Sequence, residues 1–220
     1  PATIGPGLGV TPEERSYWAF QPIRRPTVPT VENVDRVRTP IDAFLLARME
    51  KQDLSFAPEA DKSTLLRRAS LALTGLPPTH EQLAAFLADG TPEAWTKVLD
   101  RLLESPQYGE RWGRHWLDVA GYADSEGASN SDANRQWAYK YRDWVIRAIA
   151  ADMPFDQFIT WQLAGDELVE PPYKNMTTQE IDKLTATGYL RMAADGTGQS
   201  NSDETRNQVV IDTVKIVSTG

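Results

Sequence analysis

The sequence predicts an all-α domain preceded by an extended, proline-rich arm. Apolar residues recur at helical spacing, capping residues stand before these repeats, and no segment alternates with the period of two that is typical of strands. We expect about eight or nine helices in a single domain over residues 39–220. In residues 1–38, Pro22, Pro26 and Pro29 stand among large apolar side chains, so we expect this arm to pack on the helical body.

Capping residues mark the first helices. Thr39-Pro40 opens a helix whose expected buried face consists of Ile41, Phe44, Leu45 and Met49. Three further helices begin at the caps Asp61, Thr79 and Thr91. Two helices dense in aromatic residues follow at about residues 108–122 and 137–151, with a polar segment between them. The last helices are expected at about residues 155–168, 177–190 and 203–217.

Composition and charge exclude several classes of protein. The chain has 220 residues and a net charge of −8, from 23 Lys and Arg and 31 Asp and Glu. This acidic balance argues against nucleic acid as a partner, because nucleic-acid binders concentrate basic residues on one face. No apolar run reaches the ~18 residues of a membrane span, and residues 1–10 lack the pattern of a signal peptide.

The cysteine count excludes several kinds of cross-link and metal site. The chain has no cysteine, which excludes disulfides, zinc–thiolate sites, iron–sulfur clusters and covalently attached haem within it. The sequence contains no recognisable motif that pairs a nucleophile with a base, so we do not expect hydrolase activity.

The first candidate functional residue is a histidine that lies between two tryptophans in the sequence. The segment reads Trp112-Gly113-Arg114-His115-Trp116-Leu117-Asp118. Asp118 follows His115 by three residues, so both side chains can share one helix face. A carboxylate beside an imidazole fixes its tautomer, as in metal sites and general-base sites. The alternative is a partly buried histidine that is hydrogen-bonded within an aromatic core.

The second candidate is the polar segment between the two aromatic-rich helices. It carries Asp124, Glu126 and Asp132, with Gly127 and Asn130 between them. Oxygen-bearing side chains in a loop suit Ca²⁺, although the spacing is not that of an EF-hand. The alternative is a solvated polar loop with capping Asp and Asn residues.

Seven longer segments of the chain match sequence motifs of a known protein family. They are residues 17–23 (YWAFQPI), 40–48 (PIDAFLLAR), 73–79 (LTGLPPT), 105–112 (SPQYGERW), 114–120 (RHWLDVA), 141–146 (YRDWVI) and 162–168 (QLAGDEL). In this order they resemble the DUF1549 domain, also called the planctomycete cytochrome-associated or PSCyt2 domain, over about residues 16–220. The family is named for having no assigned function.

The resemblance implies a domain of a large exported protein of Planctomycetes or their relatives, in the periplasm or at the cell surface. Such proteins pair this domain with a c-type cytochrome domain. In the family pattern the last helix continues into a C-x-x-C-H haem motif, and this chain ends just before it. We therefore expect a role in electron transfer or oxidoreduction beside a haem c that the rest of the polypeptide or a partner chain carries. Whether the parent protein is an enzyme stays open.

Within this resemblance, His115 is the expected residue near the haem, as its sixth ligand or as part of its pocket. Trp112, Arg114 and Asp118 surround it in the sequence. Two alternatives remain. One is a module that binds Ca²⁺ and a glycan through the acidic segment and exposed aromatic residues. The other is a purely structural helical module of a large surface protein.

Overall fold

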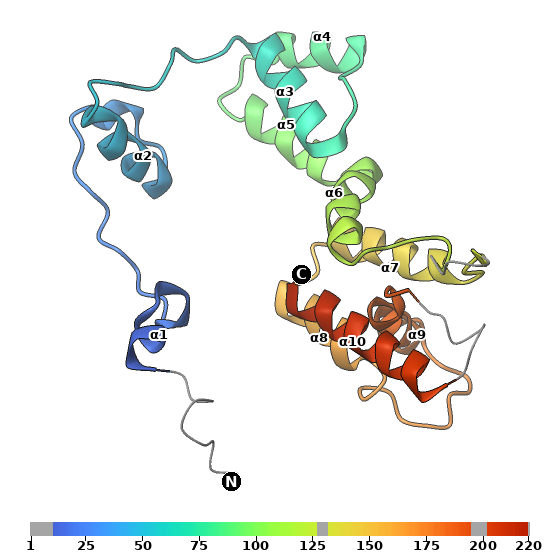
Figure 1. Cartoon of the computed structure of the whole chain (residues 1–220). Helices are drawn as coiled ribbons and strands as arrows, with labels where there is room; N and C mark the ends of the chain where they lie inside the picture. The colour runs from blue at the N-terminus through green and yellow to red at the C-terminus, as the bar shows by residue number, and fades with distance from the viewer. Residues whose placement is uncertain (1–10, 127–131, 195–201, 220) are drawn as a thin grey trace. The chain divides into compact units, whose positions relative to one another are not determined.

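The computed structural model of the chain describes residues 11–126, 132–194 and 202–219. Within these ranges the chain forms ten α-helices and three 3₁₀ helices, and the isolated antiparallel bridge between Ser125 and Asn134 is the only β pairing (Figure 1). The predicted all-α class is confirmed. None of the helices in the described ranges is long and apolar enough to cross a membrane.

The chain divides into two compact units, residues 1–59 and residues 60–220. The division therefore falls after Glu59, whereas the sequence pattern placed a boundary after Arg38. The reason lies in contacts that tie the end of the arm to the first long helix. The Glu50 carboxylate accepts hydrogen bonds from the backbone N–H groups of Glu32 and Asn33 at 3.0–3.1 Å. An Arg36 guanidinium N–H donates to the carbonyl of Ala57 at 2.8 Å.

In its described part, the first unit contains three short helical turns and one longer helix. α1 (Pro12–Ser16), η1 (Trp18–Phe20) and η2 (Val34–Arg36) precede α2 (Pro40–Glu50). The capping box at the start of α2 forms as the sequence indicates, between Thr39 and Asp42. The expected buried face of this helix is wrong: Ala43 and Leu46 are its buried residues, and Ile41, Phe44 and Leu45 are exposed.

Three helices at the start of the second unit share one hydrophobic cluster. They are α3 (Lys62–Thr74), α4 (His80–Ala88) and α5 (Ala94–Leu103). Asp61 caps α3, whose C-terminal cap is Gly75 in the left-handed conformation (φ 73°), and Thr79 with Gln82 forms the predicted capping box of α4. Leu66, Phe86, Ala94, Val98 and Leu102 form the buried centre of this cluster.

The larger core lies among the later helices of the second unit. These are α7 (Ala138–Ala150), α8 (Phe155–Ala164), α9 (Thr178–Ala186), η3 (Thr187–Arg191) and α10 (Asp203–Thr219). Trp144 and Phe158 stack at its centre, with ring centroids 5.2 Å apart and an interplanar angle of 8°. Dispersion and apolar burial by such large rings dominate the stability of a core of this kind.

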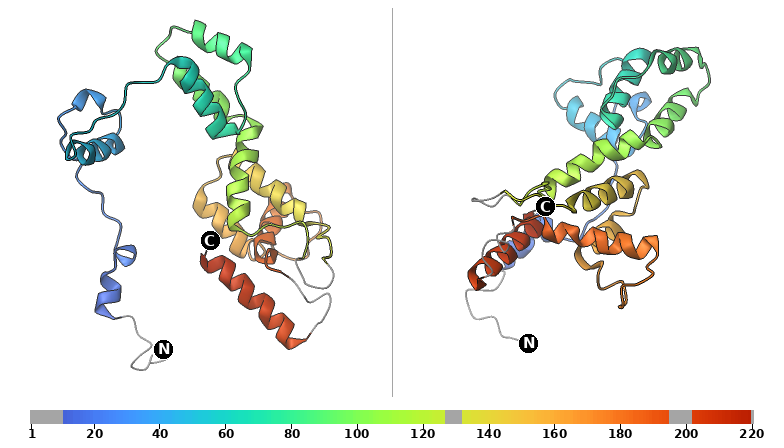
Figure 2. Two further views of the ribbon diagram at one scale, coloured as in Figure 1. Left: turned by 45° about the horizontal axis from the view of Figure 1, so that its top comes forward. Right: turned by 90° about the vertical axis from the view of Figure 1, so that its right-hand side faces the viewer.

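α6 (Pro106–Val119) joins the two groups of helices within the second unit. It packs on α3 and on α7, and both views in Figure 2 show it between them. Gly109 and Gly113 are buried where α6 approaches α7. A Cβ atom on Gly109 would lie 2.7 Å from the carbonyl oxygen of Ile146, so the crossing depends on the missing side chain.

Candidate functional site

The predicted haem-facing residues lie on the exposed side of α6. The His115 ring packs edge-on against Trp112, with centroids 5.3 Å apart, and the Trp112 side chain is 40% exposed. Arg114 Nε lies 3.9 Å from a carboxylate oxygen of Asp118, one helical turn away. All four side chains are exposed, and the structure brings them together as two pairs, Trp112 with His115 and Arg114 with Asp118. We call these four residues the α6 surface.

The pairings within the α6 surface differ from the predicted ones. Among the described residues, the ion pair of Asp118 is with Arg114, and no hydrogen bond joins Asp118 to His115. The alternative of a histidine buried in an aromatic core is also not what is observed, because His115 is exposed. The imidazole is oriented instead by its ring contact with Trp112.

Trp116, the neighbour of His115, is directed into the core instead and anchors a buried polar network. Its Nε1–H donates to Oε1 of Gln162 at 2.8 Å, and the Tyr141 hydroxyl donates to the same oxygen at 2.6 Å. The amide nitrogen of Gln162 donates to the Phe158 carbonyl at 3.0 Å. Gln162 is fully buried, and burial raises the pKa of Tyr141 well above its ordinary value, so the hydroxyl stays protonated as a donor. In the sequence, this network is indicated by a single glutamine within the mostly apolar segment of residues 158–163.

The predicted calcium ligands lie near one another in sequence but have separate partners. Asp124 accepts a hydrogen bond of 2.6 Å from the Tyr122 hydroxyl. Burial, and then this carboxylate, raise the pKa of Tyr122 to about 12. Glu126 pairs with Arg135 at 3.1 Å, and Asp132 is exposed. No three carboxylate or histidine side chains in the described ranges converge on a metal position, while Gly127 and Asn130 lie outside those ranges. Calcium binding stays a prediction.

Arg135 fixes this segment to the end of η3. Its side chain is only 8% exposed, and besides Glu126 it donates to the carbonyls of Met192 and Ala193. A buried guanidinium requires such a full set of acceptors, because an unpaired charge would be costly to desolvate. No sequence pattern distinguishes Arg135 from the other arginines of the chain.

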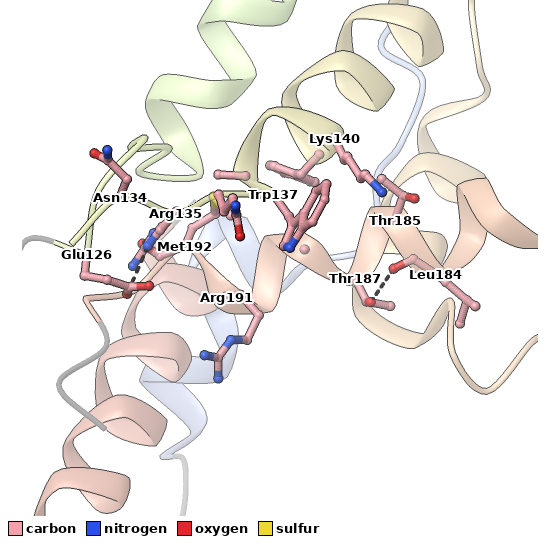
Figure 3. A pocket seen from close by; sticks show the side chains of 14 residues that line it. Glu126, Asn134, Arg135, Trp137, Lys140, Leu184, Thr185, Thr187, Arg191 and Met192 are labelled. Atoms are coloured by element: carbon pink, nitrogen blue, oxygen red, sulfur yellow. Dashed lines mark hydrogen bonds and ion pairs between the residues drawn. The ribbon is translucent and has the colours of Figure 1, made fainter. Parts of the chain in front are cut away.

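A pocket of about 490 Å³ opens beside Arg135, between the start of α7 and the segment from α9 to η3 (Figure 3). Trp137 stands in it with 63% of its surface exposed. The Lys140 ammonium lies 4.6 Å from the centre of the Trp137 ring, within cation–π distance. Thr185, Thr187 and Arg191 contribute to the lining from the other side. Sequence reasoning missed this pocket because its two walls lie some distance apart in the chain.

The comparison with protein families bears directly on the predicted resemblance. The model of a family described as "PSCyt2: Protein of unknown function (DUF1549)" matches residues 40–220. The chain belongs to the PSCyt2 family. The PSCyt2 match begins at the first residue of α2 and covers both the α6 surface and the Trp137 pocket. No curated protein and no solved structure matches the chain.

Proposed function

We propose that this PSCyt2 chain is the helical domain of an exported multidomain protein, where it packs beside a c-type haem carried outside the chain and takes part in electron transfer. The observation that supports this proposal is the α6 surface. A large aromatic ring and an imidazole in contact, both exposed on one helix, form a surface that suits a flat, mostly apolar cofactor edge. The family resemblance supplies the class of cofactor.

The residues of the α6 surface fit a haem held by another segment or chain. The chain has no cysteine, so the haem would be attached elsewhere. His115 is exposed, and among the described residues no hydrogen bond or ion pair involves its imidazole, so a ring nitrogen is available as a ligand. A bound haem would supply one-electron chemistry. Trp112 would orient the imidazole and exclude water from one side of it, and Arg114 would place a positive charge at the edge of the surface.

The test uses the product of the complete gene from its native host. Visible spectra of the oxidised and dithionite-reduced protein are expected to show the Soret and α bands of a c-type haem. His115→Ala is expected to shift these bands or the reduction potential, because it removes a ligand or a neighbour of the haem. A colourless protein would contradict the proposed function.

The chain offers a matched control for this substitution. His80 is its other histidine, exposed at the first position of α4. His80→Ala is expected to leave the spectrum and the potential unchanged. A coloured protein whose spectrum and potential respond to neither substitution would remove His115 from the proposal.

A further inference from the structure

The pocket around Trp137 is separate from the α6 surface, and the proposed function makes no use of it. It lies wholly within the second unit, and Figure 3 shows side chains from both of its walls. The exposed indole of Trp137 offers apolar surface that a bound molecule can cover. A pocket lined by an aromatic ring and a few polar groups is the usual form of a small-molecule site.

The charge of the lining selects an anionic ligand. Among the described lining residues, Arg135, Lys140 and Arg191 are cationic and Glu126 is the single carboxylate. Glu126 is paired with the buried Arg135, so these two charges offset each other. Lys140 is an exposed cation at this pocket, in a chain whose net charge is −8. A local positive field in an acidic protein favours a negatively charged ligand.

The threonines of the opposite wall select a ligand that carries hydroxyl groups. The Thr185 hydroxyl donates to the Ile181 carbonyl, and the Thr187 hydroxyl donates to the Leu184 carbonyl, each at 2.7 Å. With their protons committed inside the protein, both oxygens can offer only lone pairs to the pocket. Acceptors of this kind are matched by the O–H donors of a polyhydroxylated molecule.

Trp137 and Lys140 together offer an apolar face and a positive charge to one ligand. The indole offers a flat apolar surface for the C–H face of a sugar ring, and the ammonium 4.6 Å from its centre lies where an acidic substituent of that ring would extend. In the view of Figure 3 the Lys140 side chain extends toward the side of Thr185, and both residues line the pocket. We propose that this pocket binds an acidic saccharide, a pyranose unit that carries a carboxylate.

The test is a calorimetric titration of the full 220-residue chain with trigalacturonic acid. We expect saturable binding that weakens as the salt concentration rises, because part of it is electrostatic. The fully methyl-esterified trisaccharide keeps the rings and hydroxyls and loses the charges, so it is expected to bind at least about tenfold more weakly. Trp137→Ala and Lys140→Gln are each expected to lower the affinity by about tenfold.

Two exposed residues outside the pocket serve as matched controls. Trp18→Ala removes an indole that is 76% exposed, and Lys51→Gln removes an exposed ammonium; both are expected to bind like the parent chain. Circular dichroism verifies that every variant is folded. Absence of binding, equal binding of the methyl ester, or affinity unaffected by Trp137→Ala in a folded variant would each overturn the proposal.

Discussion

Adjacent residues of α6 have opposite roles. His115 is exposed beside Trp112, while Trp116 is hydrogen-bonded to the buried Gln162. Successive residues of a helix differ by about 100° in direction, so this division follows directly from helix geometry. The motif that the sequence presents as one unit is therefore partly surface and partly core.

Asp89 is the residue from which the pH dependence of stability can be predicted most directly. Its carboxylate accepts hydrogen bonds from the Thr91 hydroxyl at 2.6 Å and from the Thr91 backbone N–H at 2.9 Å, and Lys97 Nζ lies at 3.1 Å. These contacts lower the pKa of Asp89 to about 2 from an ordinary value of 3.8. A lowered pKa in the folded state means that ionised Asp89 stabilises the fold above pH 4, and that this contribution is lost as the pH falls toward 2.

We predict that Asp89→Asn lowers the free energy of unfolding at pH 7, and that the difference from the parent shrinks between pH 4 and pH 2. Urea unfolding followed by circular dichroism over this range measures it. Asp100→Asn removes an exposed carboxylate of α5 and is the control, with a small effect expected. A difference that stays constant with pH would show that Asp89 is not stabilising as an anion.

At the scale of elements, helix ends follow local rules and helix packing does not. Caps at Thr39, Asp61 and Thr79 form as predicted, because each joins residues three positions apart, whereas α5 begins at Ala94 and Thr91 does not cap it. The buried face of α2 was predicted wrongly, since an apolar stripe shows only which face can be buried and not what covers it. The α6–α7 crossing likewise depends on what lies opposite Gly109.

We predict that Gly109→Ala destabilises the second unit by about 1–3 kcal/mol, the usual cost of overpacking a tight contact. The added Cβ would lie 2.7 Å from a backbone oxygen and 2.8 Å from the Ala150 Cβ, neither of which can move without shifting α7. Gly90→Ala is the matched control, because no heavy atom lies within 4 Å of its Cβ position. Guanidinium unfolding compares the two. Equal stability of both variants would mean that α7 adjusts freely.

At the scale of the whole chain, the two compact units differ in how much core they contain. The second unit holds both hydrophobic clusters, one around Leu66 and Phe86 and the other around Trp144 and Phe158. In the first unit the buried apolar residues are Val31, Ala43 and Leu46 in the part that the structure describes. The family match begins at Pro40, inside the first unit, so sequence similarity and compactness mark different boundaries.

We predict that residues 60–220 fold without residues 1–59, because the fragment retains both clusters. Thermal unfolding followed by circular dichroism should give a cooperative transition with the midpoint of the second unit in the full chain. A midpoint lower by more than about 4 °C would correspond to a loss of about 1 kcal/mol or more in a domain of this size. That result would show that the first unit contributes to the core of the second.

The sequence by itself determined the helical class, most helix ends and the family. These depend on the periodicity of apolar residues, on capping residues three positions apart and on contiguous sequence motifs, all of which are local in the chain. Only the tertiary structure decided which residues are brought together. It paired Arg135 with carbonyls near residue 192, placed Trp137 across a pocket from Thr187, and committed Trp116 to Gln162. Such contacts join residues far apart in sequence, and their partners are set by how the helices pack rather than by any local pattern.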